Sequence, residues 1–281
     1  MKTILVPTDF SENAFHAAKY AAVLAQQYDM GLRLVHVFTL HIVSEIPHSS
    51  FIEAEINRQQ HDADDSMAKF KQKLANEANI DARRIETKVL SGFLVEHILN
   101  YAENTDVAMI VMGTRGASTW IDRWLGTNAQ HIMEKAACPV WVVPSNTPLT
   151  PPKYVIYASD FRGDEVAEIN TILPILRPLG ARLTVVHIRP DDALTIGTEL
   201  EDTLKELRQT FKNENVTVKN LNRRTITGGL KTYLKNQKPD LLAVMRTERG
   251  FWENLFLKSI SKHFVQEATQ PVLVFKVKSE K

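Results

Sequence analysis

Three glycines and a threonine in the first half of the chain have the spacing of a phosphate-binding loop. Gly113 and Gly116 follow the apolar run 108–112, and Gly126-Thr127 comes ten residues after Gly116, directly before a helical pattern. Glycine lets the backbone turn tightly and approach a ligand that a Cβ would exclude. A helix that opens on Gly-Thr offers backbone N–H groups, a hydroxyl and the positive end of its dipole to an anion. We therefore predict a nucleotide phosphate site here.

Few charged residues are placed to assist such a site. Asp9 follows the first apolar run, and Asp9-Phe-Ser-Glu12 has the form of a helix capping box, so Asp9 is either a cap or a ligand contact. Arg115 and Arg123 lie in the glycine loop, where they meet phosphate charge or are simply solvated. Asp122 is the only acid between Gly113 and Gly126. Without a Walker-type lysine, this loop lacks the machinery of an efficient phosphoryl transferase.

The histidines and the cysteine do not form a recognisable site. His36 lies between valines, which is typical of a hydrogen-bonded structural histidine. His41, His48 and His61 have irregular spacing that does not match a metal-ligand pattern. The single cysteine, Cys138, excludes an internal disulfide and is expected to be a small core residue. The sequence therefore predicts no metal centre.

These residues lie between elements that alternate in type. Short apolar runs alternate with helical patterns, which is typical of βαβ units and a parallel sheet. The strands of the first half are expected at 3–6, 32–38, 85–90, 107–112 and 140–143. The helices are expected at 11–28, 51–79, 93–104 and 128–137. Right-handed crossovers would bring Asp9, Val37 and Gly113 to one crevice at the carboxyl edge of the sheet.

The pattern occurs twice. Five segments match in order: 4–10 with 155–161, 32–37 with 183–188, 91–98 with 227–234, 109–112 with 242–245, and 139–143 with 271–275. The segment 144–152 between the halves is rich in proline and carries no charge, as in a semi-rigid linker. We expect a domain at 1–144, a linker at 145–152 and a second domain at 153–281. Each domain is expected to be a five-stranded, mostly parallel open sheet flanked by helices.

Composition excludes several classes of partner. The net charge of +1 and the pI near 7.9 give no basis for binding nucleic acid or an anionic membrane. No apolar run reaches the roughly 18 residues of a spanning helix. The first nine residues have too short an apolar run for a signal peptide, so we expect a cytoplasmic protein.

With these motifs in place, the chain resembles the universal stress protein family in its tandem two-domain form. Nucleotide-binding members carry G-x2-G-x9-G-[S/T], a spacing that Gly113, Gly116, Gly126 and Thr127 meet without a gap. A strand ending in Pro7-Thr8-Asp9, followed by a helix and Val35-His36-Val37, also resembles the family. The resemblance implies an adenine-nucleotide alpha-hydrolase-like fold. It also implies a bacterial stress-response regulator that binds ATP or AMP, with Mg²⁺ a candidate companion of the phosphates.

The resemblance also implies a role for each matching residue. Asp9 would lie beside the adenosine, Val37 would hold the adenine through its backbone, and Met112 with Gly113 would lie under the ribose. Gly116, Gly126, Thr127 and Asn128 would wrap the phosphates. The expected nucleotide-binding residues are Pro7, Thr8, Asp9, Val37, Met112, Gly113, Arg115, Gly116, Gly126, Thr127 and Asn128.

The second half has lost the glycine loop. Arg246 stands where the first half has Gly113, and Gly250 matches Gly116 only with a one-residue insertion. The third glycine is missing in every alignment of the two halves. A side chain in a glycine-only conformation costs about 1–3 kcal/mol, and it would also occlude phosphate. We therefore expect triphosphate binding in the first half, while Asp160 leaves an adenosine-like pocket open in the second.

Other functions remain open. The first alternative is a slow ATPase, and the second is a binder of a non-nucleotide ligand through the aromatic loop of Phe251, Trp252 and Phe256. That loop would form a lid, a pocket or a packing surface, and we favour packing. A scaffold without a ligand is a further alternative, and the intact glycine loop of the first half counts against it. The strands at 140–143 and 272–275 would pair the halves as an internal pseudo-dimer, which leaves homodimerisation open and the protein partner unknown.

Overall fold

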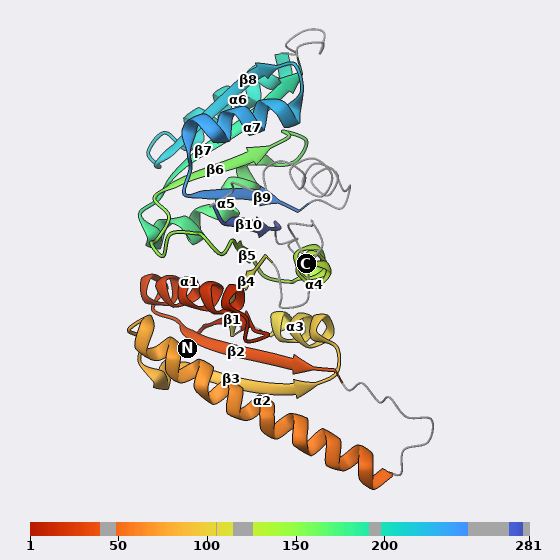
Figure 1. The fold of residues 1–281 in the computed structure, drawn as a ribbon. Coiled ribbons are helices and arrows are strands. Elements are labelled where there is room, and N and C mark those ends of the chain that lie inside the picture. Colours follow the sequence, from red (N-terminus) through yellow and green to blue (C-terminus); the bar gives the residue numbers. More distant parts are fainter. Residues whose placement is uncertain (40–48, 105, 115–125, 191–197, 247–269, 278–281) are drawn as a thin grey trace. The chain divides into compact units, whose positions relative to one another are not determined.

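The computed structural model describes residues 1–39, 49–104, 106–114, 126–190, 198–246 and 270–277. The chain divides into two compact units, Met1–Thr150 and Pro151–Lys281. Among the described residues, each unit contains five strands and the helices that connect them (Figure 1). The predicted fold class is confirmed, and the five expected strands of the first half agree with the structure to within one residue at each end.

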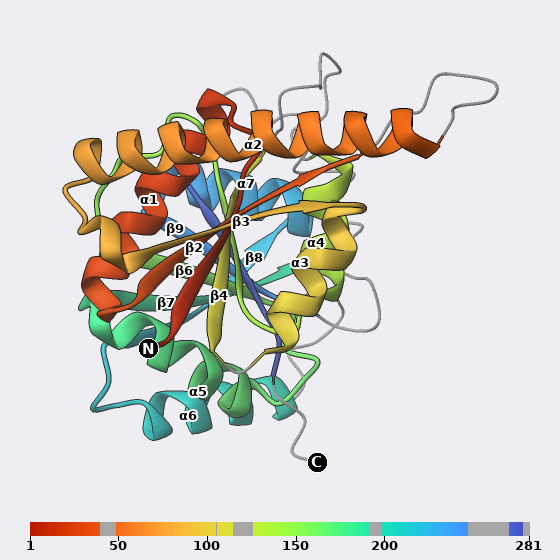
Figure 2. The same ribbon diagram turned by 90° about the horizontal axis from the view of Figure 1, so that it is seen from below.

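The first unit is an open parallel sheet. Its elements are β1 (Thr3–Pro7), α1 (Glu12–Tyr28), β2 (Gly31–Phe38), α2 (Ser49–Glu77), a short 3-10 helix (Ala82–Arg84), β3 (Ile85–Ser91), α3 (Leu94–Glu103), β4 (Val107–Gly113), α4 (Thr127–Lys135) and β5 (Val140–Val143). The strands lie in the order β3-β2-β1-β4-β5, and each pairing is parallel. Helices α1 and α2 pack on each other on one face, and α3 and α4 pack on each other on the opposite face (Figure 2).

The order of the strands creates a switch point between β1 and β4. From β1 the chain passes through α1 to β2 on one side, whereas from β4 it passes through α4 to β5 on the other. The connections therefore diverge, and the carboxyl ends of β1 and β4 border a crevice that neither connection covers. Ligands of open α/β sheets bind in crevices of this kind.

Small side chains bring α1 close to the sheet beside this crevice. Six alanines of α1 are buried: Ala14, Ala17, Ala18, Ala21, Ala22 and Ala25. Ser11 caps the helix, since its Oγ accepts a hydrogen bond from the backbone N–H of Ala14 at 3.2 Å. At the other end Asp29 adopts the left-handed conformation, with φ of 51°, and terminates the helix. Helix α1 is thus capped at both of its ends.

The second unit repeats the arrangement. Its elements are β6 (Tyr154–Ser159), α5 (Glu165–Leu176), a 3-10 helix (Arg177–Leu179), β7 (Arg182–Pro190), α6 (Thr198–Thr210), β8 (Val216–Arg223), α7 (Ile226–Gln237), β9 (Leu241–Met245) and β10 (Val272–Phe275). The strands lie in the order β10-β9-β6-β7-β8, all parallel. Helix α5 packs on α6, and α7 packs on β7 and β8. Both units are therefore wound in the same way.

Candidate functional site

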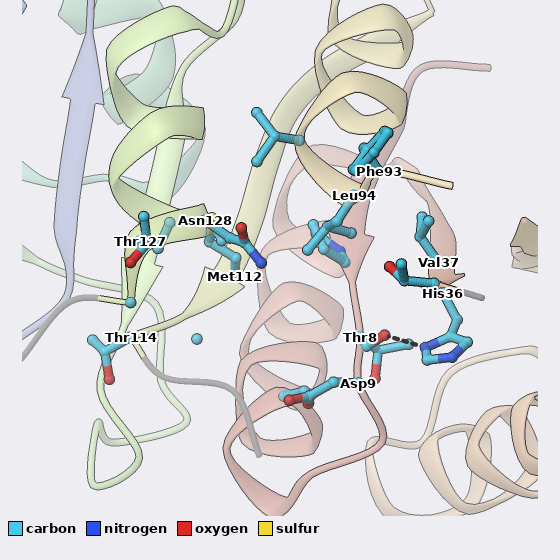
Figure 3. A pocket seen from close by; sticks show the side chains of 17 residues that line it. Thr8, Asp9, His36, Val37, Phe93, Leu94, Met112, Thr114, Thr127 and Asn128 are labelled. Atoms are coloured by element: carbon cyan, nitrogen blue, oxygen red, sulfur yellow. Dashed lines mark hydrogen bonds between the residues drawn. The ribbon is translucent and has the colours of Figure 1, made fainter. Parts of the chain in front are cut away.

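A cavity of about 540 Å³ opens at the switch point of the first unit. Its walls are the carboxyl ends of β1, β2 and β4 and the first residues of α3 and α4 (Figure 3). Nine of the eleven residues expected from sequence line it: Pro7, Thr8, Asp9, Val37, Met112, Gly113, Gly126, Thr127 and Asn128. The other two, Arg115 and Gly116, lie outside the described residues. Segments separated by more than a hundred residues thus meet in one space of ordinary ligand-pocket size.

A hydrogen-bonded turn places Asp9 at the floor of the cavity. Thr8 Oγ1 accepts a hydrogen bond from the backbone N–H of Phe10 at 3.0 Å, and Phe10 takes a left-handed φ of 64°. Asp9 Oδ1 accepts from the backbone N–H of Ser11 at 3.1 Å and from Ser11 Oγ at 2.6 Å. Ser11, rather than Asp9, caps α1. Asp9 instead orients Ser11, and its carboxylate lies at the cavity.

The backbone of Val37 faces the crevice. The β1–β2 register ends at Pro7 and Val35, and Val35 O accepts from the N–H of Thr8 at 2.9 Å. Backbone groups alternate sides along a strand, so Val37 directs its N–H and C=O to the same side as Val35. Phe38 O confirms the alternation, because it accepts from Gly92 N on the β3 side at 2.9 Å. The backbone N–H and C=O of Val37 therefore point into the space beyond the end of β1, where the chain turns into α1.

The first turn of α4 presents backbone donors at the opposite end. Gly126 is the N-cap; its N–H donates to Thr114 O at 2.9 Å, and its C=O accepts from Gln130 N at 3.0 Å. Within the described part of the chain, no side chain caps this helix, and no acceptor pairs with the N–H groups of Thr127, Asn128 and Ala129. These three donors and the positive end of the helix dipole make a site for an anion.

The geometry of Gly126 differs from the expectation of a glycine-only conformation. Its φ of −66° and ψ of 151° are open to any residue, and a Cβ there would meet only Thr114 O, at 3.8 Å. Thr127 is the first helical residue rather than the cap. The backbone of the described chain does not require glycine at 126. What glycine provides is the room in front of the α4 donors.

His36 is held on the side of the sheet that faces α1 and α2. Its Nδ1 lies 2.8 Å from Thr8 O, and its ring centroid is 4.3 Å from that of Phe10. The expectation of a hydrogen-bonded histidine is confirmed, and the residue also borders the cavity. His36 thereby fixes the backbone of Thr8 directly before Asp9.

Sequence reasoning missed several residues of the cavity wall. These are Ala14, His36, Thr39, Phe93, Leu94, Val95, Thr114 and Ala129. The β3–α3 loop could have been found, because the carboxyl end of β3 lies at the same edge as those of β1, β2 and β4. No feature of the sequence distinguishes Ala14 as a cavity residue, since it resembles the other buried alanines of α1.

The same turn is present in the second unit. Ser159 Oγ accepts from the backbone N–H of Phe161 at 3.1 Å, and Phe161 has a φ of 52°. His187 Nδ1 lies 3.2 Å from Ser159 O, and its ring stacks on Phe161 with centroids 4.7 Å apart. The duplication therefore extends to individual hydrogen bonds, with Ser159, Phe161 and His187 in the places of Thr8, Phe10 and His36.

Beside this turn, the second unit buries a pair of carboxyl groups. Glu165 and Glu168 are 5% and 2% exposed. Ser159 Oγ donates to Glu165 Oε2 at 2.6 Å, and the hydroxyl of Tyr157 donates to Glu168. Burial, together with the charge of Glu168, raises the pKa of Glu165 to about 8, and burial also raises the pKa of Glu168. The pair accordingly holds a proton at neutral pH.

Two further expectations are corrected. Gly228 is not the counterpart of Gly92: α3 begins two residues after Gly92, whereas Gly228 lies inside α7, which begins at Ile226. Cys138 is partly exposed rather than a core residue. The loop residues Asp122 and Arg123, and the aromatic residues of 251–256, lie outside the described residues.

No helix among the described residues is long and apolar enough to cross a membrane. No group of three or more His, Cys, Asp or Glu side chains in that part of the chain is arranged to hold a metal ion.

Fold and crevice together place the chain among tandem, doubly wound α/β proteins. A family model described as the universal stress protein family matches residues 1–144 and 170–276. The chain therefore belongs to the universal stress protein family, with one family domain in each half. This confirms the resemblance found from sequence.

Individual relatives agree with this assignment. A universal stress protein of Methanocaldococcus jannaschii is 31% identical over 143 residues, covering 50% of this chain and 81% of its own length. One from Thermus aquaticus is 31% identical over 142 residues, covering 50% of this chain and 98% of its own length. The crystal structure of a universal stress protein from Archaeoglobus fulgidus matches 99% of this chain and 97% of its own, with a TM-score of 0.70 and 20% identity. That last likeness shows the fold.

Proposed function

We propose that the first unit binds one adenine nucleotide, ATP or AMP, and that the protein is a nucleotide-binding regulator of a stress response. The observation that carries the proposal is the cavity at the switch point, which has backbone donors of α4 at one end and the backbone of Val37 at the other. A nucleotide has the same polarity, an anionic chain at one end and a flat base at the other.

The phosphate end is the first turn of α4. The N–H groups of Thr127, Asn128 and Ala129 face the anion, and the absence of a Cβ at Gly126 leaves room for its oxygens. Contacts of this kind contribute about 0.3–1 kcal/mol each through the helix dipole, and more where they are desolvated. A phosphate here would also satisfy donors that have no other acceptor among the described residues.

The base end is the carboxyl end of β2. An adenine edge carries one acceptor beside one donor, which matches the N–H and C=O of Val37. Asp9 lies between the two ends, where its carboxylate can accept hydrogen bonds from ribose hydroxyls. Met112 and Gly113, at the end of β4, would support the sugar from below. The regulatory role in stress is the extension of family membership to this chain.

Titration calorimetry with ATP, ADP, AMP and adenosine, with GTP for comparison, tests the proposal. We expect one adenine nucleotide per chain and weaker binding of GTP. Gly126→Val should weaken ATP binding at least tenfold, so that the affinity for ATP approaches the affinity for adenosine. Adenosine binding should be unchanged, because the valine side chain intrudes only at the phosphate end. The backbone conformation at 126 accepts valine, so the circular dichroism spectrum should be unchanged.

The same titration can overturn the proposal. A chain that binds none of the adenine compounds would refute it, and so would equal affinities of wild type and Gly126→Val for ATP. Two nucleotides per chain would show that the second unit binds as well.

A further inference from the structure

Phe93 stands at the base end of the cavity with an exposed ring. The side chain is 70% exposed although the residue lines the cavity. Figure 3 shows it near Val37, at the end of the cavity away from Thr127. Among the described residues, the other exposed large apolar side chains are Met1, at 76%, and Leu149, at 38%, and neither lines this cavity. An exposed aromatic ring at the mouth of a pocket is a surface on which a flat ligand can stack.

The position of Phe93 in its helix gives a second, independent observation. Phe93 is the N-cap of α3, and its side chain makes no capping hydrogen bond. In the second unit the N-cap of the corresponding helix, α7, is Thr225, whose Oγ1 accepts from Gly228 N at 3.2 Å. Apolar residues are poor N-caps, and threonine is a good one. Phe93 therefore contributes neither a cap to α3 nor a buried side chain to the core.

We infer that the ring of Phe93 stacks on the base of the bound nucleotide, and that Phe93 is a base-binding residue of the first unit. The inference rests on the proposed function, because it assigns the base end of the same cavity. Val37 would read the edge of the base through its backbone, while Phe93 would cover one face. An aromatic ring can stack on any base, so this contact favours ligands that carry a base over ligands that carry none.

Affinities of adenosine and ATP for position-93 variants test the inference. Phe93→Ala should weaken both ligands by the same factor, about tenfold, which corresponds to about 1.4 kcal/mol. The ratio of the two affinities should stay at the wild-type value, in contrast to Gly126→Val, which lowers it. Phe93→Trp should bind at least as well as wild type, and Phe93→Leu should lie between phenylalanine and alanine because it keeps apolar area without a π face.

Leu149→Ala is the matched control, since it removes another exposed apolar side chain outside the cavity. It should leave both affinities unchanged. Wild-type affinity in Phe93→Ala or in Phe93→Leu would overturn stacking, and so would a tenfold change in the ratio of ATP to adenosine affinity. These outcomes leave the proposed function standing, whereas wild-type protein that binds neither ligand would overturn both.

Discussion

The two units have the same strand order and the same β–α turn, but different side chains behind that turn. In the first unit the residues five and eight positions after the turn aspartate are Ala14 and Ala17. In the second they are Glu165 and Glu168, counted from Asp160. Ala14 lines an open cavity. Glu165 and Glu168 instead bury carboxyl groups that accept hydrogen bonds from the hydroxyls of Ser159 and Tyr157.

This difference shows that duplication preserved the frame and changed the chemistry of the crevice. A nucleotide phosphate chain is anionic, so alanines leave it room while carboxyl groups would repel it when ionised. The first unit therefore has the features of an anion-binding unit. At the corresponding positions after its turn, the second unit has a buried, proton-holding cluster.

The largest effect is expected from moving a carboxylate into the first unit. Ala17 is fully buried, and the partners that hold Glu168 in the second unit have no counterpart there: Val6 stands in the place of Tyr157. Ala17→Glu should lower the free energy of unfolding by roughly 3–5 kcal/mol, since the new charge is buried without a partner. Urea unfolding measures it, with exposed Ala68→Glu of α2 as the matched control. Equal stability of the two variants would contradict the comparison.

A pH titration tests the buried pair of the second unit. The pKa of Glu165 is raised to about 8 by burial, whereas an unfolded glutamate titrates near 4.3. Between these values the folded chain holds a proton that the unfolded chain has released. Stability should therefore be greatest at the acid end of this window and fall by up to about 1.4 kcal/mol per pH unit until about pH 8.

Glu165→Gln should remove this slope, because an amide can donate to Glu168 and accept from Ser159 without titrating. Urea unfolding from pH 5 to 8, with hydrogen exchange of α5 to localise the effect, makes the measurement. Glu96→Gln on the exposed start of α3 is the matched control and should keep the wild-type slope. A slope unaltered by Glu165→Gln would mean that the pair does not hold the proton.

A carboxylate at the cavity wall of the first unit should make that unit resemble the second. Ala14→Glu should weaken ATP binding by about ten- to a hundredfold through charge repulsion. Ala14→Gln, with equal size and no charge, should weaken it less. Glutamate at this position also completes a capping box with Ser11, so α1 should not be destabilised. If the two variants lost the same affinity, bulk rather than charge would be the cause.

The smallest effect concerns the helix caps. Phe93→Thr should give α3 the cap that α7 already has, and should raise the stability of the protein by about 0.5–1 kcal/mol. Thr225→Ala should lower it by about 1 kcal/mol. Thermal unfolding measures both changes. A Phe93→Thr variant less stable than wild type would show that the ring packs on the protein itself.

Much of this molecule could be predicted from its sequence, because the signals are local. Alternating apolar runs predict the strands, the matching segments predict two similar domains, and the spacing of Gly113, Gly116, Gly126 and Thr127 indicates the family. Right-handed crossovers then bring the carboxyl ends of the strands to one edge whatever the side chains are. That is why Asp9, Val37 and Gly113 could be assigned to one crevice without coordinates.

Only the tertiary structure decided how that crevice is built. The direction of the Val37 backbone depends on where β1 leaves β2, and the open space at Gly126 depends on how α4 meets β4. The ring of Phe93 reaches the cavity only through the packing of α3 beside β2. The proton held by the pair of Glu165 and Glu168 likewise follows from their burial beside Tyr157 and Ser159. Each is set by three-dimensional packing, which the spacing of residues along the chain does not encode.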